Sequence, residues 1–154
     1  YQPPQDFLSD AFAGDVPNAA VIWLTGARKD TVTRLLGHGY PSLRVRYWSR
    51  DQRTAWVLEE IGKEQPITVG LVVKRGQMER IKVLEFRESR GWEVRHPFFT
   101  DQFTDIGLDK DSQLDRHIDG ISGATLSVRA MKKLAALALY LDAEVRARDV
   151  PASP

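Results

Sequence analysis

Residues 119–147 read DGISGATLSVRAMKKLAALALYLDAEVRA, and this stretch decides how the rest of the chain is interpreted. Apolar residues recur at helical spacing through its second part, at Val128, Met131, Leu134, Ala135, Ala138, Leu141 and Val145. The spacing predicts one long helix over about residues 125–147 with a single apolar face. That face has to be buried, so we expect the helix to lie across a sheet formed by the preceding residues.

The residues before this stretch predict a mainly antiparallel sheet and two shorter helices. Leu43, Val45 and Tyr47 alternate with polar neighbours, which is the period of a strand buried on one face. Further strands are expected at 20–24, 54–61, 67–74 and 78–86, and short helices at 5–13 and 29–36. The predicted fold is therefore an α+β domain in which residues 1–154 form one unit, packed by a long C-terminal helix.

Composition narrows the classes of function. Lysine and arginine total 22 against 21 acidic residues, so no basic surface for a nucleic-acid partner is expected. The longest apolar run, residues 134–141, is far shorter than the roughly 20 residues of a membrane-spanning helix, so we expect a soluble chain without a transmembrane segment. The chain has no cysteine, which excludes thiolate metal sites and cysteine nucleophiles. Any redox chemistry therefore needs a bound cofactor.

Residues 91–120 have no clear period, and aromatic residues are spread among polar ones. A connection of this length predicts short helical turns or a segment that covers a site.

The run from Asp119 to Ser127 predicts a phosphate site. Gly120 and Gly123 permit backbone angles that other residues resist, and the small residues Ser122 and Ala124 let a bulky group approach the main chain. The first turn of the following helix offers unpaired N–H groups and the positive end of the helix dipole. This combination favours an anion such as phosphate.

Residues 119–125, Asp-Gly-Ile-Ser-Gly-Ala-Thr, resemble the recognition sequence of flavin transferase in the FMN-binding domain family. The family includes the C subunit of the sodium-pumping NADH:quinone oxidoreductase and the G subunit of the Rnf complex. The resemblance implies that a flavin transferase moves FMN from FAD onto a threonine through a phosphoester, and that Thr125 is the acceptor. A threonine hydroxyl needs a base to react, and an external transferase can supply it.

A second and weaker similarity lies at Gly76–Gly91, where the family has a strand followed by Glu-Thr-Pro-Gly and this chain has Glu88-Ser89-Arg90-Gly91. Together the two motifs place the FMN-binding region at 66–147 and leave 1–65 outside the resemblance. The residues expected to bind FMN are Asp119, Gly120, Ser122, Gly123, Ala124, Thr125, Ser127, Glu88, Gly91 and Trp92. Candidates for the wall of the flavin ring are Trp92, Phe98, Phe99 and Phe103, and candidate donors to the ring are Arg87 and Arg90.

The resemblance implies an exported flavoprotein electron carrier, periplasmic once a signal peptide or anchor has been removed. It would exchange electrons with a membrane-bound redox partner, as an electron-transfer module more than a turnover enzyme. One alternative is a non-redox interaction or sensory domain that holds FMN loosely or not at all. Another is the flavin domain of a larger membrane-associated reductase.

Other interpretations of the same residues are less specific. The run ending at Thr125 also suits a simple capped helix start, because serine and threonine favour that position. The nucleophile elbow of hydrolases needs glycine where Ala124 stands. The acidic run at 109–115 lacks the glycine and glutamate of a calcium loop, and the three histidines lack paired spacing, so neither a metal site nor a catalytic residue is predicted.

Overall fold

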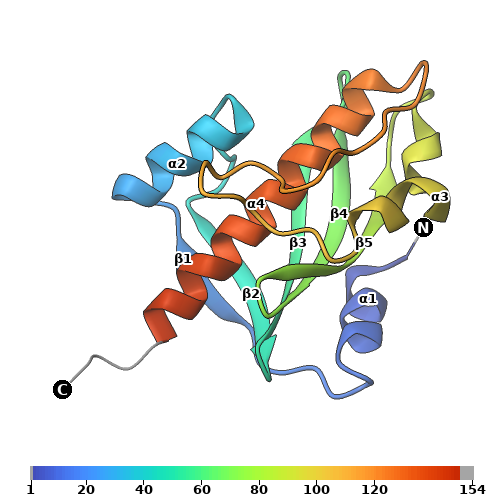
Figure 1. The fold of residues 1–154 in the computed structure, drawn as a ribbon. Coiled ribbons are helices and arrows are strands. Elements are labelled where there is room, and N and C mark those ends of the chain that lie inside the picture. Colours follow the sequence, from blue (N-terminus) through green and yellow to red (C-terminus); the bar gives the residue numbers. More distant parts are fainter. Residues whose placement is uncertain (1, 150–154) are drawn as a thin grey trace.

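The computed structural model describes residues 2–149, and its centre is a five-stranded sheet (Figure 1). The strands lie in the order of the chain, and every neighbouring pair is antiparallel. They are β1 (Ala20–Trp23), β2 (Arg44–Arg50), β3 (Arg53–Ile61), β4 (Pro66–Lys74) and β5 (Gln77–Phe86). All five predicted strands are confirmed, and so is the α+β class.

The helices are α1 (Pro4–Ala11), α2 (Gly26–Leu36) and the long α4 (Thr125–Asp149). The expected helical turns of the irregular segment are η1 (Trp92–Arg95), α3 (Pro97–Thr100) and η2 (Asp101–Phe103). Two predictions about the bounds of these elements were wrong. Helix α2 begins three residues before Lys29, directly after the extended Thr25, and Leu43 is 51% exposed because it precedes β2.

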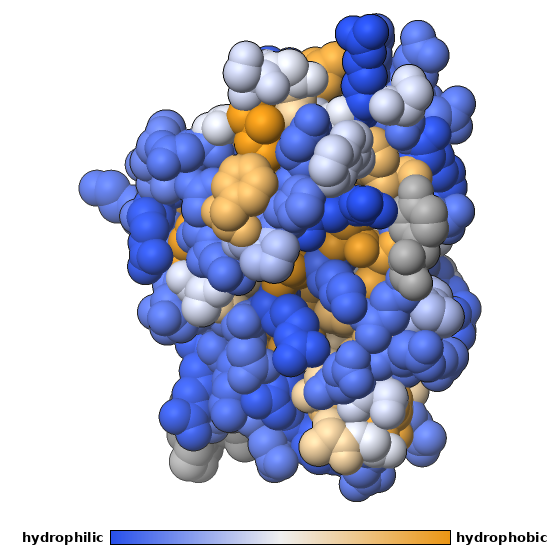
Figure 2. Space-filling model, turned by 90° about the vertical axis from the view of Figure 1, so that its right-hand side faces the viewer, coloured by the Kyte–Doolittle hydropathy of each residue, from blue (hydrophilic) through white to orange (hydrophobic). Residues whose placement is uncertain are grey.

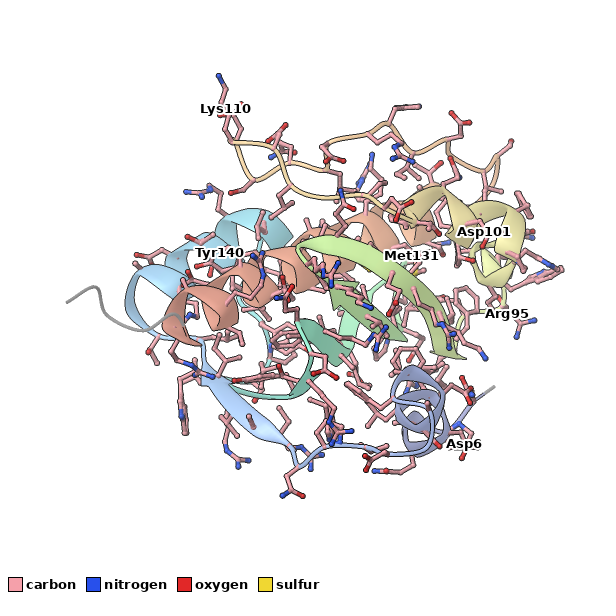
Figure 3. The ribbon with its side chains drawn as sticks, turned by 60° about the horizontal axis from the view of Figure 1, so that its bottom comes forward. Asp6, Arg95, Asp101, Lys110, Met131 and Tyr140 are labelled. Carbon is pink, nitrogen blue, oxygen red and sulfur yellow. The ribbon has the colours of Figure 1, made fainter. Side chains whose placement is uncertain are left out.

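The sheet is covered on both faces. Helix α4 crosses one face, and α1 lies against the other (Figure 1). The α4 side holds the larger core, in which Met131 faces the sheet (Figure 3). On the α1 side the Phe7 ring fills the space over Gly70, where a Cβ atom would come within 2.7 Å of the ring. The glycine therefore lets α1 pack closely.

The segment at 104–124 runs past α4 toward α2, turns there, and returns along α4 to the start of that helix (Figure 1). It is tied to β5 by two main-chain bonds, from Met78 N–H to the Ile106 carbonyl at 2.7 Å and from Asp105 N–H to the Met78 carbonyl at 2.8 Å. The Asp115 carboxylate accepts the Gly107 N–H at 3.1 Å. These bonds hold an otherwise irregular segment beside α4.

The C-terminal half of α4 carries a buried polar network. Asp142 is fully buried, and its carboxylate accepts bonds from the Thr54 hydroxyl at 2.8 Å and from Nε of Arg146 at 2.7 Å. The Trp56 indole donates to the same threonine at 2.8 Å. Every polar group of this network therefore has a partner.

Within residues 2–149, no helix has both the length and the apolar character needed to span a membrane.

Candidate cofactor site at the start of the long helix

A tight turn leads into α4. The Ala124 N–H donates to the Ile121 carbonyl at 3.0 Å, and Gly123, the third residue of the turn, has φ +82°. This is the left-handed region, in which glycine is favoured. The Val128 N–H then bonds to the Ala124 carbonyl at 2.9 Å, so Thr125 lies in the first helical turn. The turn thus delivers an exposed threonine to the positive end of the helix.

The beginning of the motif is fixed by a residue that the sequence analysis did not identify. The Gln102 side chain accepts the Asp119 N–H at 2.7 Å and donates to the Asp119 carbonyl at 3.2 Å. The Asp119 carboxylate points into solvent, 3.3 Å from Nε2 of His117. Gly120 and Ser122 are exposed, and Ala124 is buried. Gln102 and Asp119 are 17 residues apart in the sequence, so no local pattern indicates this pair of bonds.

Two predicted site residues, Ser127 and Gly91, meet on the sheet side of the helix start. Gly91 has φ +90°, and a Cβ atom there would overlap the Ser127 hydroxyl. Ser127 is 5% exposed. This contact is a tight packing of the segment after β5 against α4, and a direct role of either residue toward FMN stays a prediction.

Glu88 anchors the same segment. Its carboxylate accepts the backbone N–H groups of Glu64 and Gln65 in the turn between β3 and β4. The bond from Glu64 is the main reason that the pKa of Glu88 is lowered from its ordinary value. The charged carboxylate thus joins two loops near the helix start.

The aromatic residues divide into two groups. Phe99 and Phe103 are fully buried and form an edge-to-face pair with centroids 5.5 Å apart, so their prediction as a wall for the flavin ring was wrong. Trp92 and Phe98 are 45% and 66% exposed, with His96 between them. On this side of the molecule hydrophobic side chains lie in separate groups among hydrophilic ones (Figure 2).

The candidate donors to the ring also differ. Arg87 binds the Pro66 carbonyl at 2.7 Å and the Glu85 carboxylate at 2.6 Å, whereas Arg90 is exposed. Arg87 is therefore engaged in holding β4 and β5 together.

Thr125 borders a groove of about 590 Å³ between α4, α2 and the segment at 111–118. Its floor contains apolar side chains, including Leu35, Ile118 and Val128. Its cations are Arg34, Arg116, Arg129, Lys132 and Lys133. Within the described part of the chain none of the five forms an ion pair with a carboxylate.

This groove was not predicted from sequence, although one signal was available. Arg129, Lys132 and Lys133 follow Thr125 by four, seven and eight residues, which places them on the same side of the helix. Charged residues at such positions ordinarily indicate a solvent-exposed face. The walls formed by Arg34 and Arg116 come from elements distant in sequence, so the groove exists only in the folded chain.

The acidic run at 109–115 caps its own loop. The Asp109 carboxylate accepts the N–H groups of Asp111 at 2.8 Å and Gln113 at 3.0 Å. Over residues 2–149 no group of three or more histidine, aspartate or glutamate side chains is arranged to hold a metal ion.

The fold and site define an α+β domain that presents a threonine beside a cationic groove, an arrangement suited to a phosphate-bearing cofactor. The family model described as "FMN-binding domain" matches residues 62–140, about half of the chain. The chain belongs to the FMN-binding domain family and is a flavin-binding domain. No curated protein and no solved structure matches it.

Proposed function

We propose that the chain carries FMN attached through a phosphoester to the Thr125 hydroxyl and serves as an electron carrier. The observation that supports this is the position of Thr125: exposed, in the first turn of α4, and on the edge of a cationic groove. Helix dipole and cations both favour a phosphate there. A groove of about 590 Å³ is within the range of cofactor sites.

The chain's own residues would hold the cofactor more than react with it. Among the groove residues, Arg129 is one turn beyond Thr125 and is suited to bind the phosphate, while Leu35, Ile118 and Val128 offer apolar surface. Bound FMN would supply reversible electron transfer. His117 borders the same groove but faces Asp119, so the base that activates Thr125 is assigned to an external flavin transferase.

The same proposal extends to location and partners. An exported, periplasmic electron carrier with a membrane-bound redox partner agrees with the motif at 119–125. In this chain the polar, exposed surface around Thr125 leaves the attached cofactor within reach of a partner protein.

Attachment is tested by comparing Thr125→Ala with Thr125→Ser, each produced together with a flavin transferase. The wild type should gain the mass of one FMN and a yellow colour that survives denaturation. Thr125→Ser keeps a hydroxyl and should keep the cofactor, whereas Thr125→Ala should lose it completely. FMN that is released from the wild type on denaturation would instead identify a non-covalent flavin domain. No bound flavin at all would favour an interaction or sensory domain.

A further inference from the structure

The groove beside Thr125 is much more positive than the molecule as a whole. Its five cations are opposed by one carboxylate, Asp111, which leaves a formal charge of +4 in the groove against +1 for the chain. A cleft lined by one sign of charge focuses its field and attracts the opposite charge. The groove is therefore the part of this surface that selects an anionic partner.

The cations extend beyond the reach of one phosphate. Lys132 and Lys133 lie seven and eight residues after Thr125, which is about 11 Å along a helix that rises 1.5 Å per residue. Arg34 on α2 and Arg116 on the segment at 111–118 face the same space from other elements. A phosphodiester at Thr125 carries a single negative charge, so it leaves most of this positive charge without a counterpart.

Any enzyme that modifies Thr125 has to cover this groove, because the hydroxyl lies on its edge. In the step required by the proposed function, the Thr125 oxygen bonds to the FMN phosphorus of FAD. The bond from that phosphorus to AMP breaks, AMP leaves, and the hydroxyl proton passes to a base on the enzyme. The surface that delivers the base and FAD must contact the cationic groove at close range.

We propose that the groove is the docking surface for an acidic face of the flavin transferase, with Arg34 on α2 and Lys132 on α4 as its central contacts. This inference rests on the proposed function, since it assumes that Thr125 is the acceptor. Opposite charge on the two faces accelerates their association and orients the hydroxyl toward the transferase site. The transferase is identified as the partner by charge complementarity and by the position of Thr125 on the edge of the groove.

The test measures kcat/KM for FMN attachment from FAD by a transferase that modifies the wild type. The groove variant is Arg34→Glu with Lys132→Glu, which leaves Arg129 in place, and we expect a loss of about tenfold or more, mainly through KM. The matched control is Arg44→Glu with Lys82→Glu, which makes the same change of charge elsewhere. Arg44 is exposed beside the buried Val45, and Lys82 pairs with Gly70 on the α1 face, so both point away from α4. The control should stay within about twofold of the wild type.

Salt gives a second readout. Raising the ionic strength should slow attachment to the wild type and to the control, and change the groove variant little, because screening weakens only the charge attraction. Circular dichroism establishes that both variants are folded, and Lys132→Gln alone should give an intermediate loss. Equal rates for the groove variant and the control, or no dependence on salt, would overturn the docking surface. If none of the flavin transferases tried attaches FMN to the wild type, the proposed attachment itself is refuted.

Discussion

Polar side chains at the two ends of α4 lie in opposite environments. Near its C-terminus, Asp142 is fully buried and bonded to Thr54 and Arg146. Near its N-terminus, Thr125 is exposed, and the cations beside it form no ion pair within the described residues. A partnered buried network contributes to stability, whereas cations without a carboxylate partner remain available for an anionic ligand. The C-terminal end of α4 therefore contributes to stability, and its N-terminal end is available for binding.

The largest effect on stability is expected when the Asp142 carboxylate is removed. Asp142→Ala leaves the Thr54 hydroxyl without its acceptor and creates a cavity beside it, so the free energy of unfolding should fall by about 3 to 4 kcal/mol. Urea unfolding measures it. Glu144→Ala, two residues along the same helix, removes a partly exposed carboxylate that binds Arg28 and should cost less than about 1 kcal/mol. Equal losses in the two variants would contradict the assignment.

The second prediction tests whether the segment after β5 is locked against the helix start. Gly91→Ala places a Cβ atom on the Ser127 hydroxyl and requires an alanine at φ +90°. We expect a loss of about 2 to 3 kcal/mol in the free energy of unfolding, from overlap and backbone strain together. Adding Ser127→Ala removes the overlapping hydroxyl without placing a glycine in α4, and should restore part of the loss. No recovery in the double variant would mean that the hydroxyl is not the obstacle.

The third prediction concerns Gly123 in the turn before Thr125. It separates the cost of an unfavourable backbone conformation from the cost of steric overlap. Gly123 has φ +82°, but a Cβ atom there would meet nothing within 4 Å. Gly123→Ala should therefore cost only about 1 kcal/mol, all of it from the backbone. Thr125→Ala should change the free energy of unfolding by less than about 0.5 kcal/mol, because the side chain is exposed. A larger effect at Thr125 would show that the hydroxyl stabilises the helix start.

Much of this fold could be predicted from the spacing of apolar residues alone. The apolar spacing from Val128 to Val145 determined α4, and alternation or short apolar runs located all five strands, because burial on one face enforces those periods. The start of α2 was missed because Gly26 is a poor helix former with φ +60°, and the Thr25 side chain makes no capping bond to the helix.

The site was predictable only in part. The motif at 119–125 identified Thr125 because its residues are contiguous. The aromatic residues after Gly91 have no period, so nothing in their order separated the buried Phe99 from the exposed Phe98. The groove needed Arg34 and Arg116 to be brought beside α4, which no local pattern encodes.

The smallest expected effect on stability involves His38, whose partly exposed imidazole lies against the buried carboxylate of Glu60. Nε2 of His38 is 2.9 Å from the Glu60 carboxylate, and Glu60 is 4% exposed. The bond from His38 to the Gly39 carbonyl, followed by Glu60, raises the pKa of His38 above its ordinary value of 6.5, while partial burial and then Lys133 lower it. Because the pKa is higher in the folded chain, protonated His38 contributes its full stability below pH 6.5, and the contribution is lost as the pH rises through the raised value.

Urea unfolding of the wild type and of His38→Gln over about pH 5.5 to 9 checks this prediction. The difference between the two proteins should be largest at low pH and should shrink as the pH rises. It should stay below about 1 kcal/mol throughout, since the imidazole is 48% exposed and water screens the pair. A difference that grows with pH would mean that neutral His38 is the stabilising form. Glu60 would then be satisfied by the Ile61 N–H, its other donor at 2.8 Å, and this end of β3 would resemble the self-sufficient network around Asp142.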